Sequence, residues 1–149
     1  MDVDVTVDIR REQLPELVEA LEAAGLHHRY PDLAGELLAT GSVLPLGHSS
    51  GMELDLVVAG SGLEGLALDR ATQVEIDGVE VPVAQAIDLV VMKVLAGRGK
   101  DLEDVRALLA SGEVDLGEAR DLLCQLEEAL GQSDLLPRLE EAIADVGHR

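Results

Sequence analysis

The sequence predicts an α/β protein with a small mixed sheet, an inserted β-hairpin and a helical C-terminal half. Apolar and polar residues alternate strictly from Asp2 to Ile9, which is typical of a strand with one buried face. The pair Asp77-Gly78 stands between two runs rich in β-branched residues, which indicates a two-residue hairpin. From Ala84 onward, apolar residues recur at helical spacing.

The first half of the chain predicts alternating strands and helices. After the first strand, an apolar stripe predicts a helix over residues 14–24 that Gly25 ends. We expect a loop and then a short helix over residues 32–39, because the segment begins with two histidines, Arg29, Tyr30 and Pro31. Two strands are expected over 43–46 and 52–58, and a short helical stretch over 63–68.

The second half predicts the hairpin followed by four helices. The hairpin strands span 72–76 and 79–83, and the helix over 84–96 is apolar almost all round, so we expect it to be buried. Three polar residues are expected to cap the later helices at their N-termini, namely Asp101, Asp115 and Ser133.

Composition limits the classes of partner. The chain has 149 residues, 30 acidic against 11 basic residues, and a formal charge of −19, so its field repels nucleic-acid backbones. The single cysteine, Cys124, excludes an intramolecular disulfide, and its leucine-rich helical setting predicts a buried thiol. No apolar run is long enough for a membrane span and no secretory leader is visible, so we expect a cytoplasmic protein.

Three carboxylates share the polar faces of predicted strands. Asp2 and Asp4 lie two residues apart on one strand, and Asp55 lies on the polar face of a strand that can adjoin it. Carboxylate oxygens are the ligands that hard divalent cations prefer. The pattern therefore predicts a metal site, with the solvated face of an edge strand as the alternative interpretation.

Several segments in fixed order resemble a known family. They are Asp2-Val3-Asp4-Val5, Leu54-Asp55-Leu56-Val57, and the run from Lys93 through Gly97-Arg98-Gly99-Lys100 to Asp101 and Asp104. Together they resemble the bacterial minimal nucleotidyltransferases that include the AbiEii-like toxin proteins. The resemblance predicts a nucleotidyltransferase-like domain over residues 1–110 and a helical extension over 111–149 that packs on it.

The resemblance implies roles for particular residues. Asp2, Asp4 and Asp55 would hold Mg²⁺, while Asp4, Asp55, Lys93 and Asp101 would serve catalysis with an NTP substrate. The acceptor would be RNA or protein, and an antitoxin would be a protein partner. Two alternatives stay open: Lys93 pairs structurally, for instance with Asp101, and the domain is a catalytically inactive interaction module.

The family also implies a Gly-Ser turn shortly before the Asp-x-Asp pair, where backbone N–H groups hold the nucleotide phosphates. Here Met1 alone precedes Asp2, so we expect an N-terminally truncated domain with little transfer activity. A rival phasing places the turn at Gly41-Ser42 and the acid pair at Glu53-Leu54-Asp55. That phasing leaves Asp2 and Asp4 without a role.

Overall fold

The computed structural model describes residues 2–40, 43–60 and 62–147, and the chain divides into two compact units, residues 1–69 and 70–149. The units are described in turn. The α/β class that the sequence predicts is confirmed, with a four-stranded mixed sheet in the first unit and a two-stranded antiparallel sheet in the second. The domain boundary near residue 110 that the family resemblance implies stays a prediction.

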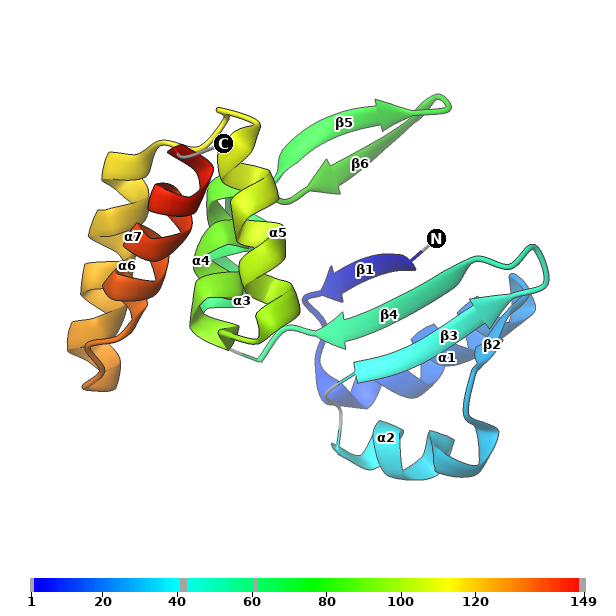
Figure 1. Cartoon of the computed structure of the whole chain (residues 1–149). Helices are drawn as coiled ribbons and strands as arrows, with labels where there is room; N and C mark the ends of the chain where they lie inside the picture. The colour runs from blue at the N-terminus through cyan, green and yellow to red at the C-terminus, as the bar shows by residue number, and fades with distance from the viewer. Residues whose placement is uncertain (1, 41–42, 61, 148–149) are drawn as a thin grey trace. The chain divides into compact units, whose positions relative to one another are not determined.

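In the first unit, the helices α1 and α2 cover one face of a sheet (Figure 1). Its elements in chain order are β1 (Asp2–Val7), α1 (Leu14–Ala23), β2 (Leu26–His28), α2 (Ala34–Thr40), β3 (Val43–His48), β4 (Glu53–Val58) and α3 (Gly62–Asp69), with short 3₁₀ turns before α1 and α2. The strand order is β1-β4-β3-β2, in which β1 runs parallel to β4 and β3 runs antiparallel to both β4 and β2.

The alternation of the strands sorts their side chains onto two faces. Leu44, Leu46 and Leu56 are buried against Leu14 and Val18 of α1, and Leu37 and Leu38 of α2 pack on the same cluster. These leucines and valines supply a core without aromatic rings because burial of aliphatic area suffices to drive packing. We call the opposite side, turned away from α1 and α2, the outer face of the sheet.

Leu26–His28 form the edge strand β2, where the sequence predicted a loop. Its register pairs Leu26 with His48 and His28 with Leu46, so His28 lies on the core side and is half-buried. Both imidazole nitrogens of His28 are buried without a hydrogen-bond partner among the described residues. The predicted loop is therefore wrong at His27 and His28, of which only His27 is exposed.

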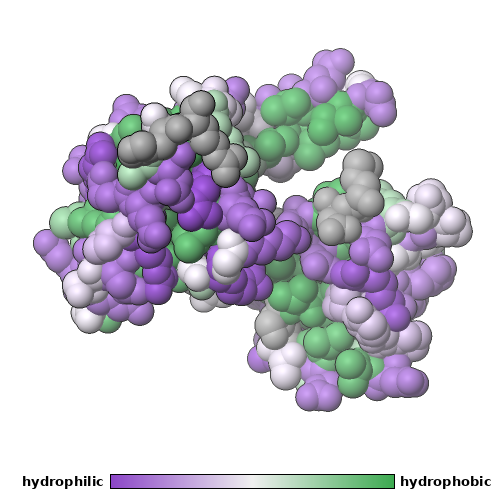
Figure 2. Space-filling model, viewed as in Figure 1, coloured by the Kyte–Doolittle hydropathy of each residue, from purple (hydrophilic) through white to green (hydrophobic). Residues whose placement is uncertain are grey.

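The second unit begins with the expected hairpin, β5 (Thr72–Ile76) and β6 (Val79–Val83). Asp77 and Gly78 both have positive φ, 51° and 80°, which fits the type I′ turn that Asp-Gly favours. The paired strands place apolar side chains on one face, where Ile76 and Val79 are more than half exposed. Figure 2 shows this hydrophobic surface on the hairpin.

Four helices complete the second unit: α4 (Ala86–Ala96), α5 (Gly99–Ala110), α6 (Leu116–Leu130) and α7 (Leu135–Gly147). α4 and α5 pack on each other and on the pair α6 and α7 (Figure 1). The buried core between them consists of aliphatic side chains: Ile87, Val90, Val91, Val94, Val105, Ala119, Leu123, Leu135, Leu139 and Ala142.

The helix ends test the predicted caps. Asp115 accepts a hydrogen bond from the N–H of Glu118 and caps α6, as predicted. The predicted cap of α7 at Ser133 is wrong, because the Glu127 carboxylate takes the N–H groups of Leu135 and Leu136 at 2.7 and 3.0 Å. Cys124 is exposed rather than buried, since it lies beside the buried Leu123 on the outward side of α6. Within the described residues, no helix is long and apolar enough to cross a membrane.

Candidate functional site: the acidic outer face of the sheet and the Lys93 helix pair

The outer face brings two of the predicted site acids together. Asp4 on β1 is the register partner of Asp55 on β4, and both strands present these positions on the face away from α1 and α2. Paired positions on neighbouring strands lie roughly 5 Å apart. The predicted pairing of the two strands, with both acids on one side, is thus confirmed. Glu53 lies two residues before Asp55 and shares the face.

An arginine that the sequence analysis missed lies on the same acids. Arg29 donates to Glu53 at 3.1 Å and also donates to the carboxylate of Asp55. Its backbone N–H bonds to the carbonyl of Pro45, so residue 29 continues the β2–β3 ladder by one step. Period two along β2 then places Arg29 on the outer face, beside Pro45 and in line with Asp55 and Asp4.

Small residues leave a path for the arginine side chain. Gly47 on β3 has no side chain, and a Cβ there would lie 3.3 Å from Cγ of Arg29. The stem of Arg29 therefore crosses β3 over this glycine to reach β4. A signal existed in the sequence: once Leu26 is taken as a buried strand position, alternation puts Arg29 on the opposite face.

The structure describes the side chains of only some of the predicted metal ligands. The backbone of Asp2 pairs with Glu53, while its side chain and the whole of Gly41-Ser42, the turn of the rival phasing, lie outside the described residues. Where the structure is described, no three His, Cys, Asp or Glu side chains gather closely enough to hold a metal ion. The chemistry of Asp4 and Asp55 nonetheless fits Mg²⁺, which binds through one or two carboxylates and keeps its waters.

In the second unit, Lys93 forms an ion pair, as expected for a lysine on an apolar helix, but its partner is Asp104. The Nζ–Oδ2 distance is 2.6 Å, and the Lys93 side chain is largely buried, with 29% of it exposed. Lys93 and Asp104 line a cavity of about 380 Å³ between α4 and α5, with Leu89, Ala107, Leu108, Ser111 and Glu113. The proposed pairing with Asp101 is wrong because Asp101 is engaged elsewhere.

Asp101 is a buried helix-start residue. It lies in the first turn of α5, and its carboxylate accepts hydrogen bonds from Nε, Nη2 and the backbone N–H of Arg98 at 2.6, 3.1 and 3.2 Å. Arg98, not Asp101, is the N-cap residue. The hydrogen bonds from the Arg98 side chain hold the pKa of Asp101 below its usual value of 3.8, although burial works against this.

A second buried acid lies on α4. Asp88 is 2% exposed, and the guanidinium of Arg70 lies 3.6 Å away while pairing with Glu118 at 2.7 Å. Burial raises the pKa of Asp88 and Arg70 opposes this rise. Gln85 donates to the Arg70 carbonyl at 2.7 Å, so the group fastens the start of β5 to α4 and α6.

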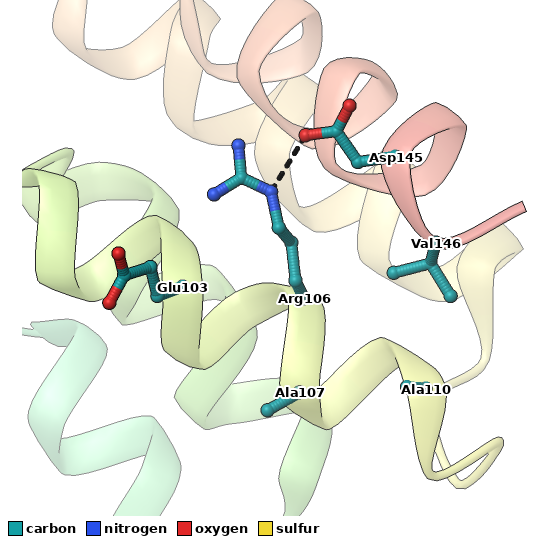
Figure 3. A pocket seen from close by; sticks show the side chains of 6 residues that line it. All are labelled: Glu103, Arg106, Ala107, Ala110, Asp145 and Val146. Carbon is teal, nitrogen blue, oxygen red and sulfur yellow. Dashed lines mark hydrogen bonds and ion pairs between the residues drawn. The ribbon is translucent and has the colours of Figure 1, made fainter. Parts of the chain in front are cut away.

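A larger cavity of about 530 Å³ lies along α5 and the end of α7 (Figure 3). Among the described lining residues, the cation is Arg106, which turns to Asp145 at 2.8 Å, and Glu103 adds another acid. Two carboxylates against one paired guanidinium do not favour a phosphate group.

Comparison with known families supports the nucleotidyltransferase class that the sequence resembles. Residues 51–136, more than half of the chain, match the family described as a nucleotidyltransferase of unknown function, DUF6036. The chain belongs to this family. No curated protein matches the sequence.

The extent of the family match bears on the site residues. It includes Glu53, Asp55, Lys93 and Asp101, and it continues through α6, beyond the part of the chain that carries the sequence resemblance. It begins after β1 and so does not include Asp2 and Asp4, whose roles stay predictions.

Proposed function

We propose that the chain is an AbiEii-like nucleotidyltransferase that transfers a nucleotidyl group from an NTP, with Mg²⁺, on the outer face of its sheet. The observation that carries the proposal is the register of Asp4 with Asp55 on adjacent parallel strands. Asp4 and Asp55 would hold the ion, whose charge would offset that of the transferring phosphoryl group.

One further residue beside this pair supports the proposal. Arg29 reaches the same face with a guanidinium, the group that binds carboxylate or phosphate in a bidentate manner. The charge of −19 disfavours RNA as the acceptor and favours a protein. A protein acceptor would agree with a toxin role, in which an antitoxin would be a further protein partner.

A specific observation favours a second candidate function. Arg29 already pairs with Asp55 and Glu53, as a structural ion pair would in a catalytically inactive interaction module. The two functions make opposite predictions about substitution of the acids.

The test is nucleotidyl transfer by the full chain. The protein is incubated with each α-labelled NTP, Mg²⁺ or Mn²⁺, and acceptors that include tRNA and a basic protein mixture. We expect a labelled protein acceptor, with labelling reduced at least about a hundredfold by Asp4→Asn or Asp55→Asn, on the scale of losing a metal-held transition-state charge. Asp8→Asn is the matched control, because it removes the same charge just beyond β1 at an exposed position.

Labelling that survives both substitutions would refute the outer face as the catalytic site. Absence of labelling with every nucleotide and acceptor would refute nucleotidyl transfer and favour the interaction module.

A further inference from the structure

We propose that Arg29 competes with a divalent cation for the carboxylates of Asp55 and Glu53, and so sets the cation affinity of the outer face. The inference rests on the proposed function in that it names the same acids. It concerns a residue outside the family match and outside the resemblance.

The contacts of Arg29 place its guanidinium where a cation would lie. It bonds to two carboxylates of one strand, Glu53 and Asp55, and Asp55 is the register partner of Asp4. The guanidinium thus provides one positive charge to two carboxylates. A divalent ion on Asp4 and Asp55 would meet that charge directly, so both cannot hold the same oxygens of Asp55.

The strand arrangement makes the encounter specific. Arg29, Pro45, Asp55 and Asp4 lie in one row across β2, β3, β4 and β1. Gly47, two residues along from Pro45, leaves the space through which the arginine stem passes. The guanidinium is therefore directed to this pair of acids by the register of the sheet rather than by a chance surface contact.

The ion pair is suited to exchange. Side-chain exposures are 25% for Arg29, 48% for Glu53 and 40% for Asp55, so the pair is reached by solvent. Nε of Arg29 is buried and has no hydrogen-bond partner among the described residues. A buried donor without a partner carries a free-energy cost, which lowers the cost of moving the guanidinium away.

The experiment measures Mn²⁺ binding to the full chain by calorimetry, without nucleotide. We expect Arg29→Gln to bind Mn²⁺ at least about ten times more tightly than the unchanged protein, the equivalent of displacing one ion pair. The gain should disappear in the double variant Arg29→Gln with Asp55→Asn. Arg29→Lys should lie between, because one ammonium holds two carboxylates less well than a planar guanidinium.

Two control variants isolate the effect. Arg10→Gln removes the same charge from an exposed position of the first unit, and Arg120→Gln frees a carboxylate, Glu140, that is bonded at 2.6 Å in the second unit. Each should change the Mn²⁺ affinity less than twofold. A gain in the controls equal to that in Arg29→Gln would overturn the proposal, as would equal affinity in Arg29→Gln and the unchanged protein.

A measurement on the unchanged protein covers the case in which Arg29→Gln does not fold. The side-chain N–H signals of Arg29 in an NMR spectrum report its carboxylate contacts, and Mg²⁺ should shift and broaden them as the guanidinium is released. Mg²⁺ binding that leaves these signals unchanged, or no binding at all, would overturn the proposal. Competition without nucleotidyl transfer would support Arg29 and refute the proposed activity, so the two failures are distinguishable.

Discussion

Gly97 ends α4 under two constraints that act on one residue. Its φ of 65° lies in the left-handed region, which costs a residue with a Cβ about 1 kcal/mol. In addition, a Cβ at this position would clash with Nη1 of Arg138, a group that donates to the carbonyl of Val94 at 3.2 Å. The left-handed φ therefore favours glycine in the Gly-Arg-Gly-Lys run, and a Cβ would also make the Arg138 guanidinium move.

Gly131 offers a matched comparison for Gly97. It ends α6 with a φ of 66°, and nothing lies within 4 Å of the position that its Cβ would take. We expect Gly131→Ala to lower the free energy of unfolding by about 1 kcal/mol and Gly97→Ala by about 1 kcal/mol more, because Arg138 loses a hydrogen bond. Urea denaturation measures both, and adding Arg138→Ala should reduce the effect of Gly97→Ala to that of Gly131→Ala. Equal effects in the two single variants would show that Arg138 moves aside without cost.

At the scale of elements, α5 depends on the ionised form of Asp101. The carboxylate accepts three hydrogen bonds from Arg98 at the start of the helix, and these hold its folded pKa below the ordinary value. A carboxyl group with a lowered folded pKa stabilises the protein at pH above its unfolded pKa, and this stabilisation is lost as the pH falls through the folded pKa. Asp88 on α4 has a raised pKa, so its contribution changes in the opposite direction.

These directions predict how two substitutions respond to pH. We expect Asp101→Asn to lower the free energy of unfolding by about 1 kcal/mol or more near pH 7, with a smaller loss near pH 4. For Asp88→Asn, the free energy of unfolding relative to that of the unchanged protein should be highest near pH 7, because ionisation of the buried Asp88 is most costly there. Chemical denaturation across this range checks both slopes. A pH-independent loss in Asp101→Asn would mean that its carboxylate charge contributes nothing to the start of α5.

The elements that were predictable from sequence are those with enough residues to show a period. β1, β4 and the hairpin show alternation over five or six residues, and their pairing could be expected from it. β2 has three residues, too few for a period, so its strand and the outward direction of Arg29 were missed. The partner of Lys93 was also missed, because the side chain of Arg98, two residues past the end of α4, occupies Asp101 and leaves Asp104 for the lysine.

The candidate site on the outer face could also be predicted only in part from the sequence. The shared face of Asp4 and Asp55 was predicted from the alternation of polar and apolar residues, because both acids belong to strands long enough to show it. Their guanidinium partner required knowledge of which strands are neighbours, since Arg29 reaches β4 by crossing β3. Local pattern defines the face of a residue, and only tertiary pairing defines what that face meets.

For the molecule as a whole, charge imbalance is the dominant electrostatic fact. Eleven basic residues can neutralise at most a matching number of the 30 acidic ones, and the remainder gives the formal charge of −19. The described ion pairs, such as Arg120–Glu140 and Arg106–Asp145, lie largely at the surface and each contributes little. Repulsion among the unpaired carboxylates therefore opposes folding more than the surface pairs support it.

This balance predicts that salt stabilises the protein, and that Mg²⁺ does so beyond its ionic strength. Screening acts within a Debye length of about 10 Å at 0.1 M salt, so we expect the melting temperature to rise with NaCl at low concentration and then level off. MgCl₂ at equal ionic strength should raise it further, because a cation bound to the folded protein shifts the unfolding equilibrium by mass action. Asp4→Asn should remove that extra rise and leave the NaCl response in place, whereas Arg29→Gln should enlarge it. Thermal unfolding of the three proteins in matched salts is the measurement. A fall in melting temperature on adding NaCl would show that the ion pairs outweigh the repulsion, and an equal response to both salts would count against a cation on Asp4 and Asp55.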